Sequence, residues 1–98
     1  MMEHFNKLTP AELERLALAA EEMGEAIQVI GKIIRHGMNS QNPLLDNGPT
    51  NKELLEKELG DVRCAIKLLC VAGDIDDDVV DYHASEKINS LERWMHHQ

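Results

Sequence analysis

The sequence predicts an all-α protein, an antiparallel helical bundle with three main helices in each chain. Aromatic residues make up 3% of its 98 residues and hydrophobic residues 43%, so the core must be aliphatic, which suits helices better than sheets. Apolar residues recur every three or four positions along most of the chain. Thr-x-x-Glu capping boxes at residues 9–12 and 50–53 mark two helix starts. At this length we expect a single domain spanning residues 1–98.

We expect the first helix to begin at Pro10, because Thr9 can cap it and proline suits the first helical position. It should end near Arg35, where Gly37 is available for a left-handed cap. Its apolar face is wide enough to need neighbours on both sides. The residues with helical spacing on this face are Leu13, Leu16, Ala20, Met23, Ile27, Ile30 and Ile34.

The remaining chain predicts a long polar connection and two more helices. Residues 36–49 form a link that is long for a compact bundle. A second helix is expected over residues 50–72, with Gly73 ending it, and a third over residues 74–95. The three acids at 76–78 fall in the first turn of the third helix, where negative charge suits the helix dipole.

Composition also indicates the setting of the protein. Three helices with wide apolar faces leave surface uncovered, so we expect a homodimer or homotetramer. The net charge of −8, from 18 acidic and 10 basic residues, argues against nucleic-acid binding. No apolar run approaches about 18 residues, and no secretory leader is recognisable, so we expect no membrane span and a cytoplasmic location. Cys64 and Cys70 are interpreted as small core residues of a reducing compartment.

Two pairs of acids interrupt the apolar stripes of the first two helices. Glu22 and Glu25 are three residues apart, as are Glu58 and Asp61, so each pair lies on one helix face. A carboxylate in such a stripe is costly unless a positive charge compensates it. Glutamate on a helix usually faces solvent, but two pairs with the same spacing favour a shared site. Four carboxylates are the oxygen ligands that Mg²⁺ or Mn²⁺ prefers, and the Glu-x-x-His of di-iron bundles is absent.

Together these acids resemble a known family. Glu-Glu-x-x-Glu over 21–25, followed by Glu-x-x-Asp over 58–61, resembles the all-α nucleoside triphosphate pyrophosphohydrolases of the MazG-like type. The segments 35–37 and 91–98 are also similar to short phage and bacterial members. The resemblance covers the chain from about Leu13 onward, and the pair of acidic motifs is its specific part.

The resemblance implies an Mg²⁺-dependent hydrolase, with Mn²⁺ as a substitute, that converts a nucleoside or deoxynucleoside triphosphate to its monophosphate and pyrophosphate. Such an activity serves nucleotide-pool control or house-cleaning. The implied metal ligands are Glu22, Glu25, Glu58 and Asp61. Glu21, together with Glu22, is implied to orient or activate the attacking water.

The triphosphate also requires protein cations. Lys32 and Arg35 lie at the end of the first helix, and Lys87 matches a phosphate-contacting lysine of the family in the third. Arg93 is a further candidate. Many members carry an asparagine four residues after that lysine, where this chain has Leu91, so the nucleotide contacts of the third helix depart from the family pattern.

The expected site lies between the first two helices, closed by the third helix and by a partner chain. Trp94 is interpreted as a core or interface anchor, with stacking on a base as the alternative. Two other functions stay open from the residues alone. One is a non-catalytic helical oligomerisation or regulatory module, and the other is a metal-dependent hydrolase of a different phosphate ester.

Overall fold

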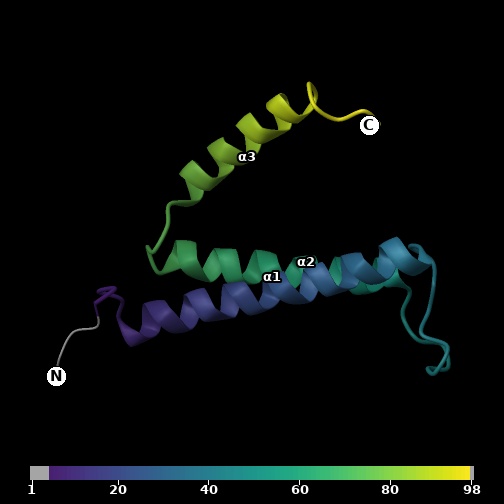
Figure 1. Ribbon diagram of the computed structural model, residues 1–98. Helices are drawn as coiled ribbons and strands as arrows, with labels where there is room; N and C mark the ends of the chain where they lie inside the picture. Colours follow the sequence, from purple (N-terminus) through teal and green to yellow (C-terminus); the bar gives the residue numbers. More distant parts are fainter. Residues whose placement is uncertain (1–4, 98) are drawn as a thin grey trace.

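A computed structural model describes residues 5–97 of the chain. It contains helices α1 (Pro10–His36), α2 (Asn51–Val71) and α3 (Asp77–Leu91), and the only extended pairing in this range is an isolated bridge between Gln41 and Thr50. The predicted all-α class is therefore confirmed. Figure 1 shows α1 and α2 side by side as an antiparallel hairpin, while α3 projects away from it.

Both predicted capping boxes start their helices. The Thr9 hydroxyl accepts a hydrogen bond from the Glu12 amide at 3.1 Å, and the Glu12 carboxylate accepts one from the Thr9 amide at 3.0 Å. Thr50 and Glu53 form the same reciprocal pair at 3.2 and 3.1 Å. These hydrogen bonds favour the charged acids, so the backbone hydrogen bond from each threonine lowers the pKa of Glu12 and of Glu53.

Among the described residues the core is small and lies between α1 and α2. Ala65 is only 1% exposed and packs with Ala19 and Leu69, while Leu18 lies against them. The small side chains of Ala19 and Ala65 let the two helices approach closely. The hairpin buries one stripe of each helix, and on α1 this stripe contains Ala19, Ala26 and Val29. The predicted apolar face of α1 is a different one, and all seven of its residues are exposed. Its large exposed side chains are Leu13, Leu16, Met23, Ile27, Ile30 and Ile34.

The third helix begins later and ends earlier than the sequence predicts. Gly73, at φ 82°, follows α2 in the left-handed region, and α3 begins at Asp77 in place of residue 74. Asp76 is the cap, since its carboxylate accepts from the amides of Asp78 and Val79 at 2.9 and 3.2 Å. The helix ends at Leu91 and not near residue 95. No residue of α3 is buried.

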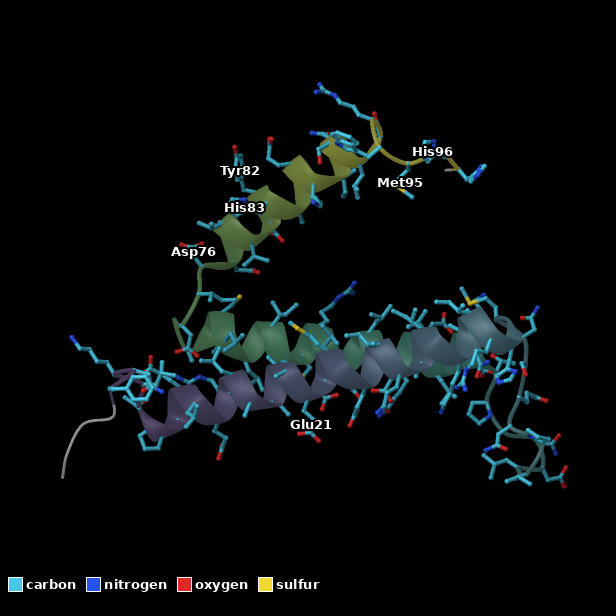
Figure 2. All side chains as sticks on the ribbon, viewed as in Figure 1. Glu21, Asp76, Tyr82, His83, Met95 and His96 are labelled. Atoms are coloured by element: carbon cyan, nitrogen blue, oxygen red, sulfur yellow. The ribbon has the colours of Figure 1, made fainter. Side chains whose placement is uncertain are left out.

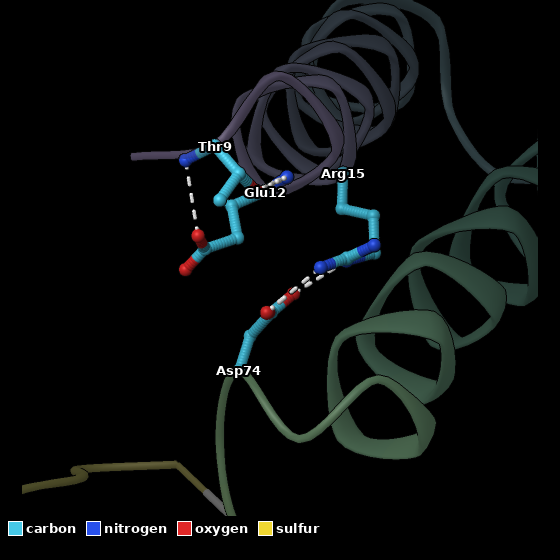
Figure 3. A network of polar contacts seen from close by, with 4 residues as sticks. All are labelled: Thr9, Glu12, Arg15 and Asp74. Atoms are coloured by element: carbon cyan, nitrogen blue, oxygen red, sulfur yellow. Dashed lines mark hydrogen bonds and ion pairs between the residues drawn. The ribbon is translucent and has the colours of Figure 1, made fainter. Parts of the chain in front are cut away.

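An ion pair ties the link before α3 to α1. Arg15 donates from Nε and Nη2 to the two carboxylate oxygens of Asp74, at 2.6 and 2.9 Å (Figure 3). The hydrogen bond from Arg15 lowers the pKa of Asp74. Asp74 does not cap the third helix because both of its carboxylate oxygens accept hydrogen bonds from Arg15 of α1.

The interpretation of the cysteines as core residues is wrong. Cys64 is exposed, and Cys70 is half-buried with its thiol 3.7 Å from a carboxylate oxygen of Asp77. Both lie on parts of α2 that α1 does not cover, because a two-helix hairpin buries only the stripe containing Ala65 and Leu69. No helix within residues 5–97 is both long and apolar enough to cross a membrane.

Candidate metal centre

Four carboxylates meet in the middle of the hairpin. Glu22 and Glu25 from α1 and Glu58 and Asp61 from α2 each offer an oxygen, and these oxygens all lie within 4.8 Å of one another. All four residues are half-buried. The three-residue spacing places each pair on one helix face, and the antiparallel packing turns the two faces together. The sequence predicted this grouping; we call the four residues the acidic cluster.

The acidic cluster lies beside the hairpin core. Ala26 and Val29 of α1 and Ala65 of α2 are buried within about one helical turn of its acids. Oxygen Oε2 of Glu22 and Oε2 of Glu58 are buried and have no hydrogen-bond partner among the described residues. Buried carboxylate oxygens without a partner are costly. A cation between the four carboxylates would satisfy them.

The neighbouring acids of the cluster disfavour the charged form of Glu25. The pKa of Glu25 is raised, first by a hydrogen bond with Glu58 that favours the protonated acid, and then by the negative charge of Glu22 and by burial. Two carboxyl groups that share a site resist simultaneous ionisation. The charge on the cluster therefore opposes folding unless a positive charge is bound there.

Lys57 supplies part of that positive charge. Its Nζ lies 2.8 Å from Oδ2 of Asp61 and 3.6 Å from Oε1 of Glu58, and the hydrogen bond with Asp61 raises the pKa of Lys57. The lysine side chain is 63% exposed, so solvent weakens the pair. Sequence reasoning missed this residue, although its four-residue spacing from Asp61 is the signal of such a pair.

Glu21 does not join the acidic cluster. It is exposed, and Figure 2 shows it projecting from the side of the hairpin opposite α3. Successive residues of a helix point about 100° apart, so Glu21 and Glu22 face different directions. The catalytic role implied for Glu21 stays a prediction.

The structure brings together two of the four predicted phosphate-binding cations. Lys32 and Arg35 line a pocket of about 440 Å³ at the loop end of the hairpin, which we call the loop pocket. Lys87 lies on α3 and Arg93 in the turn after it. Figure 1 shows that α3 projects away from the α1–α2 hairpin, whose two helices carry the acidic cluster. Sequence reasoning did not identify the other residues of the loop pocket, which are His36, Asn42, Pro43, Leu45, Pro49, Asn51 and Leu54.

Within this chain α3 does not close the site. It approaches α2 only near its own start, where Asp77, Val80 and Asp81 line a hollow with the last turns of α2. Trp94, beyond α3, is 75% exposed and anchors no core in a single chain.

Models of known protein families, curated proteins and solved structures were compared with the chain, and none matches it. The resemblance to the MazG-like family consequently stays a prediction, which rests on the pair of acidic motifs in the sequence.

Proposed function

We propose that the chain is a MazG-like nucleoside triphosphate pyrophosphohydrolase that depends on Mg²⁺, with Mn²⁺ as a substitute. It would convert ribo- or deoxyribonucleoside triphosphates to the monophosphate and pyrophosphate in the cytoplasm. The observation that carries the proposal is the acidic cluster: four carboxylates from two helices within 4.8 Å, two of them with buried oxygens that lack a partner.

The donor set fits a hard divalent cation. Glu22, Glu25, Glu58 and Asp61 offer only carboxylate oxygens, and no histidine or cysteine belongs to the group. Oxygen ligands of this kind favour Mg²⁺ and Mn²⁺ over zinc or copper. When bound, Mg²⁺ would neutralise phosphate charge and fix the position of the triphosphate.

The chain itself would supply the remaining chemistry. Water adds across the anhydride between the α and β phosphates, that bond breaks, and the monophosphate and pyrophosphate leave. Glu21 or Glu22 accepts the proton that the water loses. Lys32 and Arg35 balance the negative charge of the triphosphate from the loop end of the hairpin. The substrate is a small molecule, and the net charge of −8 disfavours nucleic acid as a partner.

We further propose that a homodimer or homotetramer completes the helical bundle. Large apolar side chains of α3 are exposed: Val79 by 50%, Tyr82 by 60% and Ile88 by 65%. An isolated helix of 15 residues is marginal in water, so α3 needs a packing partner. A second chain that covered α1 and α3 would bury these side chains and could bring Lys87 and Arg93 of one copy to the acidic cluster of the other.

The same exposed apolar surfaces favour one alternative, a non-catalytic helical module that serves only to oligomerise. The two functions differ in what they require of the acidic cluster. An oligomerisation module has no use for four converging carboxylates, and its stability should not respond to divalent ions.

One experiment separates these functions. The protein is incubated with Mg²⁺ and each common ribo- and deoxyribonucleoside triphosphate, and the monophosphate, pyrophosphate and orthophosphate are measured, together with the thermal shift caused by Mn²⁺. Equal amounts of monophosphate and pyrophosphate support the proposal. Orthophosphate without pyrophosphate indicates a different phosphate hydrolase. The absence of turnover with every nucleotide, together with no thermal shift, indicates the oligomerisation module.

A further inference from the structure

The loop pocket is positively charged in an acidic protein. Lys32 and Arg35 contribute two permanent charges and His36 adds an imidazole, whereas none of the residues that line the pocket is a carboxylate. The whole chain has 18 acidic residues and only 10 lysines and arginines. The side chains of these three basic residues form no hydrogen bond or ion pair within residues 5–97. Their donors are therefore free to bind an anion.

The base of the loop pocket is held in shape by the chain. Asn51 is 7% exposed, and its amide donates to the carbonyl of Gly37 at 3.0 Å, which joins the end of α1 to the start of α2. The backbone amides of Asn51 and Lys52 donate to the carbonyls of Ser40 and Met38, both at 2.9 Å. The pocket thus exists before any ligand binds, which lowers the entropic cost of binding.

The loop pocket and the acidic cluster lie on the same face of the hairpin. On α1, Lys32 follows Glu25 by seven residues, or about two helical turns and about 10 Å along the axis. On α2, Leu54 precedes Glu58 by four residues, or about one turn. Because residues at these spacings share a helix face, a ligand can extend from the cluster to the pocket without crossing a helix.

We propose that the loop pocket is a phosphate-binding site, and that it holds the terminal phosphates of the triphosphate while the scissile anhydride lies at the acidic cluster. The planar guanidinium of Arg35 and the ammonium of Lys32 are suited to phosphate oxygens. The identity of the ligand as substrate rests on the proposed function, whereas the affinity of the pocket for phosphate does not.

The phosphate affinity is tested without metal. Pyrophosphate is titrated into the full chain in EDTA and followed by calorimetry and by side-chain NMR signals of Arg35 and Asn51. Saturable binding is expected, with shifts confined to the pocket. Lys32→Gln and Arg35→Gln should each weaken binding about tenfold, the loss of one charged hydrogen bond. Lys67→Gln on α2 makes the same change in net charge outside the pocket and should leave binding unchanged. No saturable binding, or an equal loss in the Lys67 variant, would overturn the site.

Inhibition kinetics distinguish two ligands of the loop pocket, the phosphates of the substrate and a separate phosphate compound. If the pocket holds the substrate's own phosphates, pyrophosphate competes with the triphosphate, and Lys32→Gln weakens both to a similar degree. If pyrophosphate inhibits without competing, the pocket serves a separate phosphate ligand and its assignment to the substrate is overturned. Metal-free pyrophosphate binding without any turnover would sustain the phosphate site and refute the proposed function. Turnover without pyrophosphate binding would support the proposed function and refute the phosphate site.

Discussion

The α1–α2 hairpin and α3 differ in how their apolar residues are used. Every apolar residue that is buried within residues 5–97 belongs to the hairpin, among them Ala19, Ala65 and Leu69, whereas α3 buries none of its residues. Both regions have apolar residues at helical spacing. The difference shows that periodicity specifies a face for packing but not the partner that covers it. The acidic cluster is assembled by contacts between α1 and α2, whereas α3 contributes no residue to it.

The largest expected effect is on turnover. Glu58→Gln removes one carboxylate of the acidic cluster and should lower the rate of pyrophosphate release by about 100-fold or more, because a metal ligand and its charge are lost. Glu56→Gln on the exposed side of α2 makes the same change in net charge and should retain full activity. Activity of the Glu58 variant within a few-fold of the parent would show that the hairpin acids are not the catalytic centre.

The second effect is on stability without metal. In EDTA, Glu58→Gln should raise the Tm, because it removes one negative charge from the four acids, and the amide NH2 can donate to a neighbouring carboxylate where Oε2 of Glu58 has no partner. Saturating Mg²⁺ should raise the Tm of the parent by mass action and leave the variant nearly unchanged. Differential scanning calorimetry with and without Mg²⁺ measures both. A destabilised, metal-responsive variant would mean that Glu58 has a structural role and the cation binds elsewhere.

The third effect concerns the uncovered apolar surfaces. Ile27 on α1 and Ile88 on α3 are 68% and 65% exposed, and a charge at either position should reduce the oligomeric mass if a second chain covers it. Light scattering after size exclusion should show a dimer or tetramer for the parent and a smaller species for Ile27→Glu and Ile88→Glu. Glu86→Gln on α3 is a control that changes the charge of the exposed surface without changing an apolar side chain. A parent that is monomeric at the same concentration would leave α3 without a partner in solution.

The smallest effect is expected at the junction between the two regions. The pKa of Asp74 is held below its ordinary value of 3.8 by Arg15, so the pair contributes stability above that pH, and this stability is lost as the pH falls through the lower folded-state pKa. Asp74→Asn should lower the Tm by a few degrees at neutral pH and by less at acid pH.

Hydrogen exchange provides a second measurement at this junction. Amides of residues 73–76 should exchange faster in the Asp74→Asn variant than in the parent, because the link before α3 loses its tie to α1. Asp46→Asn in the exposed loop is the control. Unchanged exchange at 73–76 would show that the ion pair does not hold the link.

Local signals in the sequence predicted the hairpin and the acidic cluster. Thr9 and Glu12 are three residues apart, so helical geometry alone determines their contact. Glu22 and Glu25 have the same spacing and share one face of α1, and the packing of α2 brings the second pair of acids to that face. The start of α3 was predicted wrongly because several nearby aspartates can cap a helix. A contact with Arg15, 59 residues away in the chain, decides that Asp74 is not the cap.

The positions of the distant cations and of the cysteines could not be predicted by the same means. Periodicity places Lys87 on a helix, but the direction of that helix depends on contacts that no short pattern encodes. The apolar character of Cys64 suggested burial, yet the hairpin has a single packing seam and that residue lies outside it. Lys57, by contrast, could have been identified from the sequence, because it lies four residues before Asp61 on the same helix.

The closure of the long loop at its base has an evolutionary consequence. The side-chain amide of Asn51 donates to the carbonyl of Gly37, and Gln41 forms a bridge with Thr50, so the ends of the two helices are joined at the base of the loop. Residues 42–48 extend beyond these contacts. Doubling the length of such an excursion costs only about 0.6 kcal/mol. Insertions and replacements at the tip can therefore reshape the loop pocket, which Asn42, Pro43 and Leu45 line, while the four carboxylates of the acidic cluster keep their register.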